Sequence, residues 1–295
     1  MRFTQRAAIL ITAAIPGLAL VAAATAAAAP APSVPGTAHE AKGCITVTAT
    51  IPVGHDPVGV AADPKTNAIY VTNAIDNTVS VISGQANTVT ATIPVGTAPF
   101  AVATDPKTNT IYVTNFDDNT VSVISGRTNT ATIPVGTAPI AVAANPKTNT
   151  IYVTNNMDNT VSVISGRTNT VTATIPVGTA PVGVAANPKT KTIYVTNAFG
   201  NTVSVISGRT NTVTATIPVR LRPIAVAANP KTKTIYVTNF FGNTVSVISG
   251  RTNTVTATIP VGTAPDAVAA NPKTNAIYVT NFGDNTVSVL SPCPK

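Results

Sequence analysis

The chain carries few of the side chains that enzymes use for chemistry. Its 295 residues include two histidines, two cysteines and ten acidic residues. General acid–base and nucleophilic catalysis need titratable groups that the fold brings together. His39 lies in a Pro- and Ala-rich segment, and His55 precedes Asp56 in a loop, where an isolated His–Asp pair is usually incidental. No serine stands in a nucleophile-elbow motif, so we expect a protein that is not an enzyme and needs no cofactor.

A metal site is the one route to catalysis that the sequence leaves open. Asp117, Asp118 and Asp158 could offer oxygen ligands to calcium, but they do not follow the spacing of an EF-hand loop. We therefore predict no metal ligands and keep an enzyme with an unrecognised metal site only as an alternative.

The N-terminal segment predicts an exported protein. Residues 1–29 carry Arg2 and Arg6 and then an uncharged apolar run that ends in small residues, which is typical of a secretory signal peptide cleaved near its end. Residues 30–43 are rich in Pro and Ala and predict a flexible tether. No later segment is long and apolar enough to span a bilayer. We expect an extracellular protein, either secreted or associated with the cell envelope.

A unit of about 42 residues recurs six times along the rest of the chain. All six tyrosines occupy the same position of an I-Y-V-T-N motif, namely Tyr70, Tyr112, Tyr152, Tyr194, Tyr236 and Tyr278. One unit predicts four short strands, over 140–144, 151–154, 160–165 and 171–177, in which the last two alternate apolar and polar residues. Such a period with four strands per unit indicates propeller blades rather than helical repeats. The predicted fold is all-β, a six-bladed β-propeller of four-stranded antiparallel blades over residues 44–293, followed by a tail at 294–295.

The repeated motifs resemble those of a known family. I-Y-V-T-N, N-T-V-S-V-I and A-T-I-P-V-G-x-x-P are similar to the YVTN family of β-propeller repeats, here of a secreted bacterial type, and the resemblance extends from Cys44 to Cys293. Many members of that family look seven-bladed, whereas this sequence supplies six copies, so the predicted blade number comes from the count.

The two ends of the array predict how the ring closes. The first unit opens with a lone fourth strand over 45–53, and the last unit stops after its third strand at 286–290. The N-terminal strand is therefore expected to complete the last blade. Superposing the repeats places Cys44 and Cys293 next to each other in the turn between those two strands, and cysteines of exported proteins usually pair. We predict a disulfide, with two free thiols as the alternative.

Charge separates the two faces of the predicted ring. The turns after the first and third strands of each blade share one face, where twelve basic residues oppose only Asp63 and Asp105. These basic residues are Lys65, Lys107, Lys147, Lys189, Lys191, Lys231, Lys233, Lys273, Arg127, Arg167, Arg209 and Arg251. Such a face can attract polyanions weakly. Alternatively, the charges only solubilise a turn that was copied six times.

The opposite face is where the copies differ, as recognition loops on a fixed scaffold usually do. Its aromatic rings beside polar groups suit a glycan, peptide or protein partner, and we predict a non-catalytic binding module. The candidate ligand-binding residues are Phe100, Phe116, Asp117, Phe199, Arg220, Arg222, Phe240, Phe241, Asp266 and Phe282.

Several alternatives stay open for this face. The phenylalanines could pack between blades as core, and Asp76, Asp118, Asp158 and Asp284 could serve tight turns. Arg220-Leu221-Arg222 replaces the G-T-A of other copies, so it could pair with Asp266, contact an anionic ligand, or reflect repeat drift. The whole protein could also be a passive structural or adhesive scaffold held to the envelope by its basic face.

We predict that the mature protein is a monomer. Each A-T-I-P-V segment places a proline in the outermost strand of its blade, which blocks edge-to-edge association. Light scattering should give a mass near that of one chain at every concentration, whereas stable oligomers would contradict the prediction.

Overall fold

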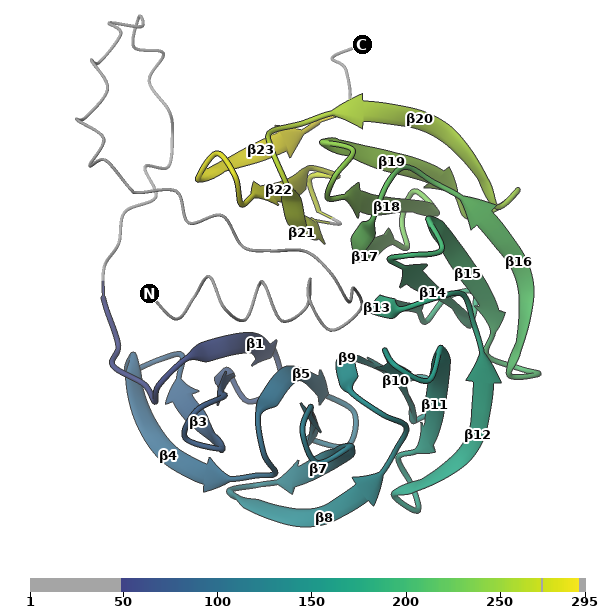
Figure 1. Ribbon diagram of the computed structural model, residues 1–295. Coiled ribbons are helices and arrows are strands. Elements are labelled where there is room, and N and C mark those ends of the chain that lie inside the picture. Colours follow the sequence, from purple (N-terminus) through teal and green to yellow (C-terminus); the bar gives the residue numbers. More distant parts are fainter. Residues whose placement is uncertain (1–48, 272, 292–295) are drawn as a thin grey trace, which may run out of the picture. The chain divides into compact units, whose positions relative to one another are not determined.

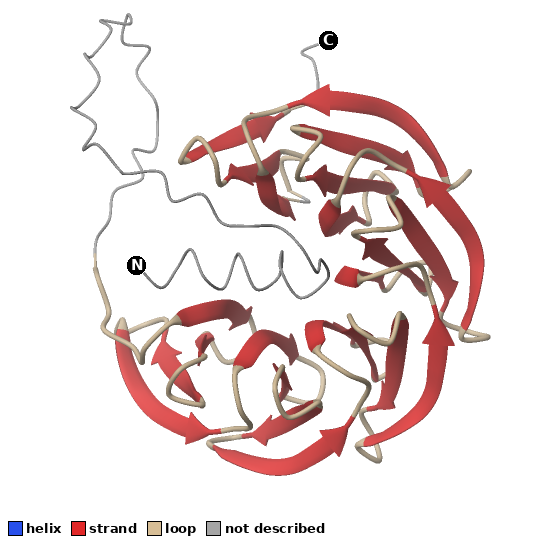
Figure 2. Ribbon diagram, in the orientation of Figure 1, coloured by secondary structure: helices blue, strands red, loops and turns tan. Residues whose placement is uncertain are grey.

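The protein is built from six antiparallel sheets, as the repeat predicts. The computed structural model describes residues 49–271 and 273–291, and within them it contains strands β1–β23 and no helix. Five sheets have four consecutive strands and the last has three, β21–β23 (Figure 1, Figure 2). The predicted six-bladed all-β architecture is confirmed.

The strand bounds follow the repeat. The first sheet contains β1 (Pro57–Asp63), β2 (Ala68–Asn73), β3 (Thr78–Ser83) and β4 (Thr88–Pro94). The second contains β5 (Pro99–Asp105), β6 (Thr110–Asn115), β7 (Thr120–Ser125) and β8 (Thr128–Pro134). The third contains β9 (Pro139–Asn145), β10 (Thr150–Asn155), β11 (Thr160–Ser165) and β12 (Thr170–Pro176). The fourth contains β13 (Pro181–Asn187), β14 (Thr192–Asn197), β15 (Thr202–Ser207) and β16 (Thr212–Pro218). The fifth contains β17 (Pro223–Asn229), β18 (Thr234–Asn239), β19 (Thr244–Ser249) and β20 (Thr254–Pro260). The last contains β21 (Pro265–Ala270), β22 (Ile277–Asn281) and β23 (Thr286–Leu290).

The sheets follow one another as blades within one compact unit that begins at Ala49. The first strand of each blade contacts the first strand of the next, in the order β1, β5, β9, β13, β17 and β21. The first strand lies innermost and the fourth outermost (Figure 1).

The core lies between successive blades. Tyr112 and Val121 on one side of the second blade pack against Ile151, Val153 and Ile164 on the facing side of the third. Both sides of a middle strand are therefore apolar, and each of these side chains is buried. Full burial of such a residue contributes roughly 2 kcal/mol, so the packing between blades stabilises the fold strongly.

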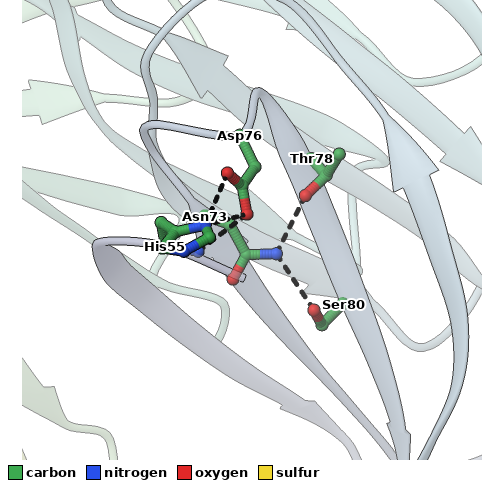
Figure 3. Close-up of polar contacts among 5 residues, drawn as sticks. All are labelled: His55, Asn73, Asp76, Thr78 and Ser80. Carbon is green, nitrogen blue, oxygen red and sulfur yellow. Dashed lines mark hydrogen bonds and ion pairs between the residues drawn. The ribbon is translucent and has the colours of Figure 1, made fainter. Parts of the chain in front are cut away.

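The Thr and Asn of the I-Y-V-T-N motif join strands through their side chains. Thr154 Oγ1 accepts a hydrogen bond from the Ala141 N–H and donates one to the Val182 carbonyl of the next blade, both at 2.9 Å. Asn155 Nδ2 donates to Thr160 Oγ1 and Ser162 Oγ at 2.9 Å. The same asparagine contacts recur in every blade, and Figure 3 shows those of Asn73 in the first. The Thr and Asn of the motif thus stabilise the blades and the contact between them.

The last blade lacks the predicted fourth strand in the described residues. Residues 49–53, the described part of the strand expected over 45–53, form no strand. Val287 and Val289 of β23 are each 56% exposed, whereas their second-blade counterparts Val121 and Val123 are buried. Among the described residues, this side of β23 is therefore left exposed. Cys44, Cys293 and residues 45–48 lie outside the described residues, and the ring closure and the disulfide stay predictions.

Asn155→Ala should destabilise the protein by about 2 kcal/mol, because it leaves the buried hydroxyl of Ser162 and the half-buried hydroxyl of Thr160 without their amide donor. Urea unfolding monitored by circular dichroism would measure the change. Met157→Ala in the adjacent loop is the matched control, since Met157 is exposed, and it should change the free energy of unfolding by less than about 0.5 kcal/mol. Equal stability of the Asn155→Ala variant and the wild type would contradict the role assigned to this amide.

Candidate functional site

The loops and turns lie on two opposite faces, as predicted. The leading loop of a blade precedes its first strand, and the central loop joins its second and third strands. These two loops are bonded together, as where the Phe116 N–H donates to the Ala98 carbonyl at 3.0 Å. The remaining turns meet on the other side, where the Gly166 N–H donates to the Asn149 carbonyl at 2.9 Å. We call these sides the loop face and the turn face.

Asparagines connect the loop face from one blade to the next. In the first five blades, the last residue of the central loop is an asparagine whose Oδ1 accepts a hydrogen bond from a backbone N–H in the leading loop of the following blade. Ala98, Ala138, Ala180, Arg222 and Ala264 donate these bonds over 2.8–3.0 Å. The asparagines also adopt positive φ angles, which this residue type tolerates better than most. The loops are therefore held in defined positions.

Aspartates in four blades hold the leading loop onto the central loop of the same blade. Asp118, Asp158 and Asp284 accept hydrogen bonds through Oδ2 from the backbone N–H of a threonine at 2.5–2.6 Å. These contacts support the interpretation that the aspartates stabilise tight loops. The fourth blade and the fifth have Gly200 and Gly242 at the same position.

The first blade carries a histidine in this arrangement. Asp76 Oδ2 accepts a hydrogen bond from the His55 N–H at 2.7 Å, and Asp76 Oδ1 lies 2.9 Å from His55 Nδ1 (Figure 3). The hydrogen bonds from the backbone and then the ring of His55 lower the pKa of Asp76. The side chain that His55 contacts is thus 21 positions away, a pairing that the sequence did not indicate.

The fourth and fifth blades form a different arrangement around Arg222. Its guanidinium carbon lies 5.4, 5.9 and 4.9 Å from the ring centroids of Phe199, Phe240 and Phe241. The rings of Phe240 and Phe241 meet edge to face at 5.3 Å. Arg222 is only 7% exposed, and burial lowers its pKa. Cation–π contacts of this kind fix a guanidinium and its surrounding rings.

Arg220 and Gly242 fit together as departures from the repeat. In the second blade a Cβ on Gly96 would lie 2.6 Å from both Asn115 Cγ and Asp118 Oδ2, so the asparagine and the aspartate both crowd this position. In the fifth blade Arg220 replaces this leading-loop glycine and Gly242 replaces the aspartate, and a Cβ on Gly242 would lie 3.2 Å from Arg220 Cβ. The glycine in the central loop therefore avoids a close contact with the arginine in the leading loop.

Large apolar side chains are exposed around this arrangement. Phe199 is 40%, Leu221 59% and Phe241 57% exposed. We define the aromatic–arginine patch by six residues from three loops: Phe199, Arg220, Leu221, Arg222, Phe240 and Phe241. Five of them were predicted, and Leu221 was missed although it lies within the same departure from the repeat.

The other predicted residues belong to the second blade and the last. Phe100 and Phe116 of the second blade have ring centroids 6.4 Å apart, and Asp117 is exposed beside Phe116. Phe282 is 53% exposed in the central loop of the last blade. Asp266 is the second residue of β21, and its carbonyl accepts a hydrogen bond from Thr238 Oγ1 of β18 at 3.5 Å.

The suggestion that the phenylalanines form core between blades is wrong. The buried apolar clusters of the described blades consist mainly of Tyr, Val and Ile, and none of the six phenylalanines there is buried. The positions between blades belong to the repeated motif, so the varying loop residues lie at the surface.

The turn face is basic. Its lysines and arginines are exposed apart from the half-buried Lys191. Asp63 and Asp105 are each 1% exposed, and Asp63 Oδ1 accepts a hydrogen bond from the Lys65 N–H at 2.9 Å. The two carboxylates therefore serve their own turns, which leaves the exposed charge of this face positive.

Within residues 49–271 and 273–291, no three His, Cys, Asp or Glu side chains are grouped as a metal ion would require. No helix there has the length and hydropathy needed to cross a membrane.

Known proteins resemble this chain in part. Residues 130–238 match the family described as YNCE-like β-propeller. The PE-PGRS family protein PE_PGRS18 of Mycobacterium tuberculosis is 63% identical over 35 residues, which are 12% of this chain and 8% of that protein. The chain therefore matches less than a tenth of this relative. The predicted resemblance to YVTN-type propeller repeats is confirmed by the family match and the six blades.

The fold also occurs among solved structures. A chain of Kuenenia stuttgartiensis hydrazine synthase superposes with a TM-score of 0.57 at 17% identity, covering 86% of this chain and 100% of that chain. At this identity the likeness concerns the fold alone.

Stability should depend on the loop-face aspartates at acid pH. The backbone hydrogen bond from His55 lowers the pKa of Asp76, and that from Thr263 lowers the pKa of Asp284, below the ordinary 3.8. A lowered pKa stabilises the fold above the unfolded-state value, and this contribution is lost as the pH falls through the folded-state value. The melting temperature should therefore decrease as the pH is lowered below about 4.

An Asp76→Asn/Asp284→Asn variant should melt lower than the wild type at pH 7 and lose less stability on acidification. Melting monitored by circular dichroism between pH 7 and the acid range would show both effects. Asp117→Asn is the matched control, because this exposed aspartate takes no part in the hydrogen bonds described above. Identical pH profiles of the double variant and the wild type would contradict the assignment.

Proposed function

We propose that this protein is a non-catalytic binding module that uses its loop face to hold a peptide, protein or glycan partner. The observation that carries the proposal is the exposure of Phe199, Leu221 and Phe241 on neighbouring loops. Exposed apolar side chains gathered in one place often mark interaction sites.

The rigidity of these loops supports a binding role. Asn201 Oδ1 accepts a hydrogen bond from the Arg222 N–H at 2.8 Å. The Arg222 side chain lies among three aromatic rings. A preorganised surface loses less conformational entropy when a partner binds. The contact area of the patch can therefore contribute to affinity with a small entropic cost.

The use of the loop-face carboxylates also supports a module without catalysis. Asp118, Asp158 and Asp284 bind backbone N–H groups of their own loops. A carboxylate held in this way stabilises a loop, whereas a general base must reach the proton that it removes.

The turn face supports a second candidate, a passive scaffold held to the envelope. Its exposed charges are cations, because Asp63 and Asp105 are buried in turns. Attraction of this kind to an anionic envelope polymer would be nonspecific and strongly weakened by salt. Residues 1–29 carry the features of a secretion signal, which agrees with an extracellular place for either function.

The test compares two variants of the mature protein against arrays of peptides, glycans and anionic envelope polymers, at low and at physiological salt. Phe199→Ala/Phe241→Ala removes the exposed rings, and Lys147→Gln/Arg167→Gln/Lys189→Gln/Arg209→Gln neutralises part of the turn face. Binding that persists in physiological salt and is lost with the rings would establish the proposed function. Binding that disappears with salt and with the cations would support the scaffold and contradict the binding module.

A further inference from the structure

We infer that the aromatic–arginine patch binds an acidic peptide segment that carries a large apolar side chain. This inference rests on the proposed function and names the partner class for one part of the loop face.

Charge separates the patch from the rest of the loop face. Its three loops, 197–201, 219–223 and 239–243, contain two arginines and no Asp or Glu. Four other central loops carry an aspartate where this region has Gly200 and Gly242. The patch is thus a cationic region on a face whose other charged residues are mainly acidic, and it offers charge complementarity to a carboxylate-bearing partner.

The apolar part of the patch complements this charge. Phe199, Leu221 and Phe241 are exposed next to the exposed Arg220. A guanidinium can donate two parallel hydrogen bonds to one carboxylate, while the rings and the leucine offer an apolar contact a few ångströms away. Aromatic residues and arginine are also the types that dominate binding energy at protein interfaces.

The polar groups of the patch favour a peptide over a neutral glycan. Asn201 Oδ1 accepts a hydrogen bond from the Arg222 N–H at 2.8 Å, and Asn243 Oδ1 accepts one from the Ala264 N–H at 2.9 Å. Asn239 Nδ2 donates to Thr244 and Ser246. One polar atom of each of these amides is therefore already engaged in the fold, and the three loops supply no carboxylate to bind sugar hydroxyls.

The surroundings of the patch favour a short acidic segment over a long polyanion. A nucleic acid strand needs a cationic groove that follows its backbone, whereas elsewhere on this face lie Asp117, Asp118 and Asp158. A short peptide can place a carboxylate on the exposed Arg220 without meeting these aspartates.

The experiment measures fluorescence anisotropy of labelled short peptides in which a central Phe or Leu is flanked by Asp and Glu. One control peptide replaces the acids with Asn and Gln, and another replaces the apolar residue with Gly. The protein variant Arg220→Gly/Leu221→Thr/Arg222→Ala restores the G-T-A found in four other leading loops, and circular dichroism verifies that it folds. Phe282→Ala is the matched control, since it removes an exposed ring of the same face outside the patch.

The acidic apolar peptide should bind the wild type and the Phe282→Ala protein equally. Phe199→Ala, Phe241→Ala and the G-T-A variant should each weaken binding by roughly tenfold or more. Both control peptides should also bind at least roughly tenfold more weakly.

Three results would overturn the inference. They are equal binding of the uncharged peptide, unchanged binding by the folded G-T-A variant, and tighter binding of a single-stranded oligonucleotide or a neutral oligosaccharide at the patch. Binding of any probe that is lost with Phe116→Ala but retained by the G-T-A variant would place the site elsewhere and leave the proposed function standing. A loop face that binds no peptide, glycan or oligonucleotide would overturn both.

Discussion

Each middle strand of this protein is apolar on both sides, so no blade can bury its core without a neighbour. Tyr112 and Val121 on one side of the second blade need Ile151, Val153 and Ile164 on the third, and equivalent clusters recur between the following blades. This dependence between neighbours is the general condition of repeat proteins. It explains why the I-Y-V-T-N motif is retained in every copy, and why β23, which lacks cover among the described residues, exposes Val287 and Val289.

Because the blades hold one another, their connecting loops can differ without loss of the fold. Asparagines connect the central loops of the first five blades to the next leading loop, and aspartates connect the two loops within four of the blades. Where Gly200 and Gly242 replace the aspartate, the fixed contacts are fewer and the fifth blade accommodates Arg220. The aromatic–arginine patch thus lies in the two blades that lack the aspartate hydrogen bond between leading and central loops.

The two faces carry different chemistry as a result. The turn face repeats the same basic turns from blade to blade, and its two carboxylates are buried. Its positive charge is therefore spread evenly and does not form a localised site. The loop face combines acidic central loops with one cationic and aromatic region around Arg222. A localised arrangement of this kind can discriminate between partners, whereas a uniform charge attracts any polyanion. This contrast is the physical reason for proposing that recognition takes place on the loop face.

Period, strand bounds and the division into two faces could all be read from the sequence, because alternation of apolar residues and turn preferences are local properties. The strands expected over 151–154 and 160–165 coincide with β10 and β11 to within one residue. The choice between core and surface for the phenylalanines could not be made in this way, nor could the pairing of His55 with Asp76. Arg222 meets rings from residues 23 positions before it and 18 and 19 after it. Only the packing of two blades brings those three loops together, so the composition of the patch was decided by the tertiary structure.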